Sequence, residues 1–148
     1  LGMAMGRDLG EKMVQGGRFK DIDAIVPIPL HWRRQWHRGF NQAEIVSRGV
    51  AGGVGALSDG KVIPVIRNLV KRVKNTSTQT RLTGKEKAEN VKNAFRVEKK
   101  VALQLLSKGI NHILLVDDVL TSGSTLAACA APLMQYFRVS VATIGFVE

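Results

Sequence analysis

The chain has 148 residues and a formal net charge of +10, from 22 Lys and Arg residues against 12 Asp and Glu residues. Hydrophobic residues account for 45% and charged residues for 23%, which is usual for a globular protein and excludes a largely disordered chain. The length suits a single domain over residues 1–148 that can bury a core. The positive charge favours a phosphate-rich ligand, either a nucleotide-like small molecule or a nucleic acid.

The single cysteine, Cys129, excludes an internal disulfide and a Cys-rich metal site within these residues. It lies in an apolar segment that favours a helix, which makes it a packing residue rather than a nucleophile. The charge-free stretch 119–137 is polar in its first half and contains Pro132, so we expect no membrane span. No signal-peptide pattern is visible, which favours the cytoplasm.

The N-terminal part of the chain predicts a helix, a strand and a basic loop. An apolar stripe predicts a helix over residues 6–19, ended by the glycine pair at 16–17. Residues 23–30 predict a short buried strand that its two prolines end at the sheet edge. Residues 31–42 combine three arginines, two histidines and two tryptophans, which we interpret as a loop.

The middle of the chain predicts a second helix and a second strand. The helix is expected from about residue 41 to 50, closed by the glycines at 52–53, and residues 61–66 read as the strand. Residues 71–92 are the most basic and polar part of the chain, which indicates a loop. A short helix is expected from Thr83 onward, with Thr83 as N-cap and a glutamate three residues later.

The most informative segment covers residues 113–125 and reads Ile-Leu-Leu-Val-Asp-Asp-Val-Leu-Thr-Ser-Gly-Ser-Thr. This order predicts a buried strand, a short loop and the N-terminus of a helix. A helix start offers unpaired backbone N–H groups and a partial positive charge, which suit a phosphate, and Gly123 lets the backbone come close. Pro132 is expected to bend or shorten that helix, and residues 139–147 predict a final strand parallel to the 113 strand.

The paired acids before the hydroxyl-rich loop suggest a sugar ligand. Ionised carboxylates accept hydrogen bonds from two neighbouring hydroxyls, so Asp117 and Asp118 suit a diol. A diol acceptor beside a phosphate cradle indicates a ribose 5-phosphate. The alternative is a strand–turn–helix in which the acids and hydroxyls only cap the helix.

The segment resembles the phosphoribosyl-pyrophosphate (PRPP) binding motif of type I phosphoribosyltransferases. The resemblance implies an α/β fold with a parallel sheet, helices on both faces and a small hood. It implies that Asp117 and Asp118 act as catalytic residues that hold the ribose hydroxyls and, indirectly, Mg²⁺. The 5-phosphate would be bound by Thr121, Ser122, Gly123, Ser124 and Thr125.

Two further blocks are similar to the ComF/GntX branch of that family, named for competence and gluconate-utilisation proteins. They are Val-Pro-Ile-Pro-Leu with Arg-Gly-Phe-Asn-Gln at 26–42, and the region 69–97, so the resemblance runs from about residue 21 to 144. Lys87 stands where the family usually has an arginine, so a bidentate grip is lost there. The branch typically carries an N-terminal zinc element, which is not visible here; the chain begins at Leu1, and a fragment lacking that element is one expectation.

The resemblance also assigns the basic segments. A pyrophosphate loop would be formed by Arg33, Arg34 and Arg38, because guanidinium groups match phosphate oxygens two at a time. The alternatives are a solvated basic surface loop and a stacking platform for single-stranded nucleic acid. Lys71 and Arg72 would stabilise the departing pyrophosphate from a mobile loop, unless they belong to a solvated charged face.

Two classes of function remain open. The first is a Mg²⁺-dependent phosphoribosyltransferase that transfers a 5-phosphoribosyl group from PRPP to an unidentified acceptor. The second is a non-catalytic module of the same fold that binds single-stranded DNA or a protein of the competence machinery during DNA uptake. The acceptor pocket is expected in a hood built from residues 71–97 and the N-terminal segment, and the sequence leaves an oligomer open.

Overall fold

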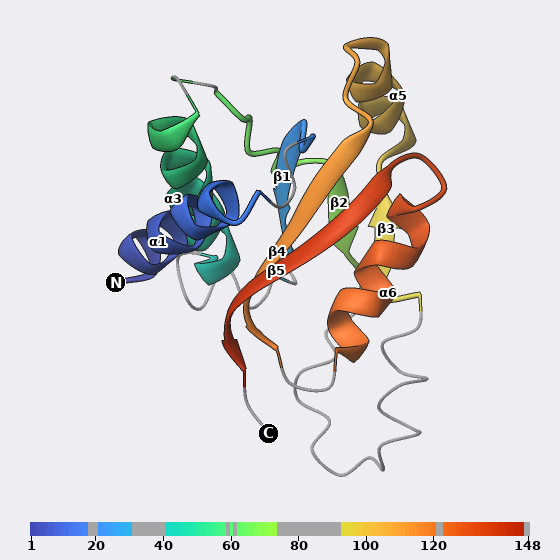
Figure 1. Cartoon of the computed structure of the whole chain (residues 1–148). Coiled ribbons are helices and arrows are strands. Elements are labelled where there is room, and N and C mark those ends of the chain that lie inside the picture. Colours follow the sequence, from blue (N-terminus) through green and yellow to red (C-terminus); the bar gives the residue numbers. More distant parts are fainter. Residues whose placement is uncertain are drawn as a thin grey trace, which may run out of the picture.

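The computed structural model describes residues 1–17, 21–30, 41–58, 60, 62–73, 93–120 and 123–146. The elements run in the order α1 (Gly2–Gln15), β1 (Ala24–Pro27), α3 (Gln42–Leu57), β2 (Val70–Arg72), β3 (Phe95–Val97), α5 (Lys99–Ser107), β4 (His112–Leu120), α6 (Ser124–Leu133) and β5 (Arg138–Phe146) (Figure 1). The described ranges therefore contain an α/β fold, as the sequence predicts.

The central sheet is parallel, with β4 between β1 and β5. The strand expected over residues 61–66 is reduced to one parallel bridge between Val65 and Ile25 on the outer edge of β1. Two hydrogen bonds support it: Ile25 N–H donates to the Pro64 carbonyl at 2.9 Å, and Ile66 N–H donates to the Ile25 carbonyl at 2.8 Å. Pro64 has no N–H of its own to donate, which disfavours a longer ladder.

Both faces of the sheet are covered, α1 and α3 on one and α6 with the β2–β3 ribbon on the other (Figure 1). The side chains of β4 alternate between these two faces. Leu114 and Val116 pack in the cluster with α1 and α3, whereas Ile113 and Leu115 pack in the cluster with α5 and α6. All four side chains are fully buried, which is why this strand is a continuous apolar run.

Helix α3 corrects one expectation, because it continues to Leu57 through the glycines at 52–53. Gly53 serves the packing of α3 against α1 instead of termination, as does Gly6 on α1. A Cβ added at Gly53 would lie 2.1 Å from the Arg7 carbonyl oxygen, and one added at Gly6 would lie 2.3 Å from the Val46 carbonyl oxygen. Helix α1 starts at Gly2, four residues earlier than expected, and ends at Gln15 with Gly16 as its C-cap.

Three elements were not predicted from the sequence, namely β2, β3 and α5. Strands β2 and β3 form a separate antiparallel ribbon, in which Arg72 lies opposite Phe95, and α5 follows directly. Three-residue strands carry little periodicity, which explains why this ribbon escaped notice. The loop expected over 71–92 is wrong at its start, because Lys71 and Arg72 belong to β2. Residues 74–92, with Thr83, Lys87 and the short helix expected there, lie outside the described residues.

Candidate functional site

The carboxyl ends of the parallel strands lie at one edge of the sheet. Strand β4 ends at Leu120 and β5 at Phe146, and α6 begins nearby at Ser124 (Figure 1). In open α/β sheets, ligands bind outside the carboxyl ends of the strands. The PRPP-like segment falls at this edge.

Asp117 and Asp118 lie within β4, which continues past them to Leu120. The ladder to β5 explains this, because Asp117 pairs with Thr143 and the pairing continues to the end of the strand. Both acids are half-buried. Their backbone is fixed by the sheet, so the carboxylates are held on a rigid element.

The acid pair is electrostatically strained. Burial, a hydrogen bond with the Asp118 side chain and the negative charge of Asp118 raise the pKa of Asp117 to about 6. The Asp118 N–H, which donates to Asp117 Oδ1 at 2.9 Å, and the charge of Arg72 offset part of this rise. The pair would therefore gain from an added cation or from hydroxyl donors.

The start of α6 has the geometry of an anion site. Gly123 is its N-cap with φ of 80°, a left-handed conformation that favours glycine. Gly123 has no side chain with which to cap the helix, and the alternative in which the acids and hydroxyls only cap it stays a prediction. Ser124 and Thr125 are half-buried in the first turn, while Thr121 and Ser122 lie outside the described residues.

Lys71 and Arg72 have different surroundings in the structure. Arg72 has its guanidinium carbon 5.3 Å from the centre of the Phe95 ring, and its charge reaches Asp117. Lys71 is 59% exposed and pairs with Glu98 at 3.6 Å. The charge of Arg72 therefore lowers the pKa of Asp117, whereas Lys71 belongs to a surface ion pair.

Several predicted residues lie outside the described ranges, namely Arg33, Arg34 and Arg38 of the expected pyrophosphate loop. Their roles stay predictions.

Cys129 is fully buried, and burial raises the pKa of its thiol, so its assignment as a packing residue is confirmed. Pro132 lies in the last turn of α6, which ends at Leu133, so the helix is short.

Two pockets at the same edge could not be predicted from the sequence, because their walls come from several elements. One of about 500 Å³ opens beside Asp118 and lies between α1, α3 and β5. The other, of about 400 Å³, is lined by Pro27, Pro29, Asn41, Glu44, Arg67 and Asn68. In the second, Glu44 already pairs with Arg67 at 3.3 Å and with Arg48 at 2.8 Å.

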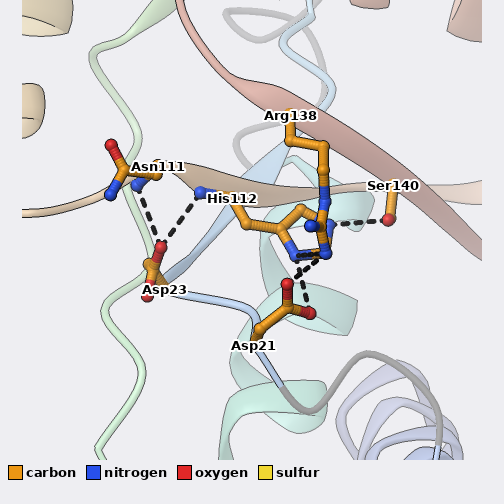
Figure 2. Close-up of polar contacts among 6 residues, drawn as sticks. All are labelled: Asp21, Asp23, Asn111, His112, Arg138 and Ser140. Carbon is orange, nitrogen blue, oxygen red and sulfur yellow. Dashed lines mark hydrogen bonds and ion pairs between the residues drawn. The ribbon is translucent and has the colours of Figure 1, made fainter.

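A polar cluster lies at the opposite end of the sheet, where β4 and β5 begin, and it was not predicted from the sequence (Figure 2). His112 Nδ1 lies 3.1 Å from Asp21 Oδ1, and its Nε2 lies 2.7 Å from the Ser140 hydroxyl. Arg138 binds the same Asp21 carboxylate and lies 3.2 Å from His112 Nδ1. Because the imidazole is only 5% exposed and shares Asp21 with Arg138, we assign the cluster to the stability of the fold.

Asp23 completes this clamp. Its carboxylate accepts the backbone N–H groups of Asn111 at 2.9 Å and His112 at 3.0 Å (Figure 2). The two aspartates therefore tie the chain before β1 to the beginnings of β4 and β5. The clamp fixes the register of β4 and β5, and this register positions the acid pair towards the carboxyl end of β4.

No three His, Cys, Asp or Glu side chains among the described residues gather as a metal site. No helix in the described ranges is long and apolar enough to cross a membrane.

Comparison with known proteins gives relatives named for competence and DNA use. The chain is 43% identical over 104 residues to Competence protein F of Haemophilus influenzae, which covers 70% of this chain and 41% of the relative. It is 39% identical over 113 residues to DNA utilization protein YhgH of Salmonella typhimurium, and 35% identical over the same length to YhgH of Escherichia coli K12. Each of these two matches covers 76% of this chain and 44% of the relative.

No protein-family profile matches the chain. The matched segment spans less than half the length of the curated relatives, 41% to 44%. Activities of the whole relatives are therefore matters for proposal. The chain is a homologue of Competence protein F and of the DNA utilization protein YhgH over most of its own length.

Proposed function

We propose that the chain is a PRPP-binding, phosphoribosyltransferase-like protein of the ComF type, with a role in competence or DNA utilization. The observation that carries this proposal is the acid pair in β4 placed just before the glycine-capped start of α6. A ribose 5-phosphate carries a diol that suits the acid pair and a phosphate that suits the start of α6. The names of the relatives support the link to DNA use.

Each group at the edge has a part in this proposal. Asp117 and Asp118 accept the ribose 2′ and 3′ hydroxyls, and the N–H groups at the start of α6 bind the 5-phosphate together with Ser124 and Thr125. Arg72, whose charge already reaches Asp117, faces the reacting end of the ligand. Arg33, Arg34 and Arg38 are proposed to bind the pyrophosphate.

Mg²⁺ fits the residues present. The acid pair supplies hard oxygen donors, which Mg²⁺ prefers. Mg²⁺ is usually held by one or two carboxylates together with substrate phosphates, and the acid pair and the pyrophosphate would supply that set of oxygens. When bound, the ion would neutralise charge on the pyrophosphate.

The proposed reaction needs positioning more than a covalent nucleophile. A nitrogen of the acceptor attacks the ribose C1 while the bond from C1 to the pyrophosphate oxygen breaks. Rigid support of the diol by β4 holds C1 in place, which lowers the entropic part of the barrier. Exclusion of water protects the cation-like transition state from hydrolysis.

The test compares PRPP binding by the wild type and by Asp117→Asn/Asp118→Asn, with Mg²⁺ and with EDTA, using titration calorimetry. The proposal expects micromolar binding that requires Mg²⁺ and is lost in the variant. Binding that is unchanged in the variant would remove the acid pair from the site. Absence of PRPP binding to the wild type would reject the proposal.

The second candidate is a non-catalytic module that binds single-stranded DNA. The net charge of +10 and the relatives named for DNA utilization favour it. Fluorescence anisotropy with a labelled thymidine oligonucleotide tests it. With four phosphate contacts, affinity should fall about 50-fold between about 50 and 200 mM NaCl. A salt-insensitive or undetectable interaction would eliminate this candidate.

A further inference from the structure

Arg72 places a positive charge on the inner face of the β2–β3 ribbon. In β2, Val70 is buried, Lys71 is exposed and Arg72 is half-buried, so Val70 and Arg72 share the face that turns towards the core. Their cross-strand partners in β3 are Val97 and Phe95, which lie on the same face. A guanidinium on this face is partly removed from water, which is unfavourable unless other contacts compensate for it.

Phe95 supplies such a contact. The guanidinium carbon of Arg72 lies 5.3 Å from the centre of the Phe95 ring, within the range of a cation–π interaction. Phe95 is 6% exposed and belongs to the same buried cluster as Leu126 and Cys129 of α6. Close packing holds the ring in one place, whereas an unsupported arginine side chain would sample many rotamers. The ring is therefore a fixed surface for a flexible side chain.

The stacked guanidinium acts on the side of the ribbon that faces the proposed site. Burial raises the pKa of both Asp117 and Cys129, and the charge of Arg72 opposes the rise in each. Its charge thus reaches β4 and α6, the two elements that form the ribose–phosphate site. Lys71, the next residue along β2, is 59% exposed and pairs with Glu98 at 3.6 Å. The location of the Arg72 charge therefore depends on the face of the ribbon and on the ring beneath it.

We propose that Phe95 is a positioning residue, which holds the Arg72 guanidinium towards the phosphates of PRPP beside the acid pair. This inference rests on the proposed function, because it assigns a further residue to the same site. Arginine binds phosphate oxygens two at a time, so its contribution depends on the orientation of the guanidinium plane. A ring that fixes this plane before the ligand arrives reduces the entropy lost on binding.

A double-mutant cycle tests whether Phe95 acts through Arg72, with PRPP affinity in Mg²⁺ measured by titration calorimetry. Phe95→Leu keeps an apolar side chain in the core and removes the ring, and should weaken PRPP binding about three- to tenfold. Arg72→Met should weaken it about tenfold or more. The double variant should bind PRPP within about twofold of Arg72→Met, because the ring then has no guanidinium to hold.

An NMR measurement on the free protein tests the stacking itself. Protons above an aromatic ring resonate upfield, so the Arg72 Nε–H signal, identified by its loss in Arg72→Met, should lie upfield in the wild type. Phe95→Leu should move this signal downfield. Arg72→Lys, which keeps the charge and loses the planar group, should weaken PRPP binding about as much as Phe95→Leu.

Val70→Ala is the matched control for general damage to the ribbon. Val70 is 2% exposed on the same face and pairs with Val97, outside the stack. The change removes buried apolar atoms, so it should lower the unfolding temperature about as much as Phe95→Leu does. Its PRPP affinity should stay within about twofold of the wild type. All variants are compared at a temperature at which each is folded.

The outcomes separate the two proposals. Additive losses of affinity in the cycle, an unchanged Arg72 signal in Phe95→Leu, or an equal loss of affinity in Val70→Ala would overturn the positioning role of Phe95 alone. Failure of the wild type to bind PRPP would overturn the proposed function and the inference that rests on it.

Discussion

Asp117 is the residue whose environment departs most from that of an ordinary surface acid. Its carboxyl group lies within a strand, beside a second acid, and its pKa rises from 3.8 to about 6. A folded-state pKa above the unfolded value means that the folded protein binds this proton more tightly than the unfolded chain does. The contribution to stability is therefore full below about pH 4 and is lost as pH rises towards 6.

Asp117→Asn should accordingly stabilise the protein at pH 8. The full shift corresponds to about 3 kcal/mol, which solvent screening of a half-buried group reduces to about 1–2 kcal/mol. Urea unfolding at pH 4 and pH 8 should show a gain for the variant at pH 8 alone. Asp8→Asn, at an aspartate 61% exposed on α1, should show no such dependence. A variant less stable than the wild type at pH 8 would contradict this assignment.

Ser140 is the residue-scale test of the clamp at the opposite edge. Ser140→Ala leaves the buried Nε2 of His112 without the hydroxyl that lies 2.7 Å away. An unsatisfied buried polar atom costs about 1–3 kcal/mol, so the free energy of unfolding should fall by that amount. Ser107→Ala removes an exposed hydroxyl bonded to the Gln104 carbonyl and should cost less than about 0.5 kcal/mol. Equal effects of the two changes would refute the clamp.

At the scale of elements, the α1–α3 pair depends on backbone contact at glycines. A Cβ at Gly49 would lie 2.3 Å from the Met3 carbonyl oxygen, and one at Gly53 would lie 2.1 Å from that of Arg7. Backbone atoms cannot move aside cheaply, so the helices would have to separate. These glycines, four residues apart, explain why α3 continues through a segment that sequence reasoning took as its end.

Gly49→Ala should therefore destabilise the protein by about 2 kcal/mol or more, although alanine favours a helix. Gly52→Ala is the matched control in the same helix, because its nearest neighbour is the end of the Arg7 side chain at 3.9 Å. That control should stabilise by about 0.5–1 kcal/mol. Thermal unfolding of the two variants separates the effects, and a stabilising Gly49→Ala would disprove close helix contact.

The start of α6 allows a similar matched pair. Gly123 and Gly109 have φ of 80° and 86°, so alanine at either position should cost about 1–2 kcal/mol. Only Gly123 lies at the proposed phosphate site, so Gly123→Ala should also weaken PRPP binding, measured by calorimetry. Gly109→Ala should lose stability with its PRPP affinity intact. Equal affinities for the two variants would place the phosphate elsewhere.

Elements with strong periodicity were predictable from the sequence. The apolar run before Asp117 and the final strand led to the parallel pairing of β4 and β5, which the structure confirms. The extent of β4 was not predictable, because polar residues at 117–118 resemble a loop unless the partner strand is known. The β2–β3 ribbon depends on pairing across 22 residues of intervening chain between Arg72 and Phe95, which local patterns do not encode.

At the scale of the whole molecule, the stabilising clamp and the candidate functional site lie at opposite ends of the strands of one sheet. The clamp around His112 fixes the beginnings of β4 and β5, and the acids and the α6 start lie at their carboxyl ends. The residue types of the candidate site were visible in the sequence. The pocket beside Asp118 was not, because its walls come from α1, α3 and β5, which meet only in the fold.

Calorimetric titration of the wild-type chain with PRPP, in Mg²⁺ and in EDTA, is the decisive test of the ribose–phosphate site. We expect one site per chain with micromolar affinity in Mg²⁺ and little or no heat in EDTA. No binding in Mg²⁺ would contradict the ribose–phosphate site and leave single-stranded DNA as the ligand to pursue.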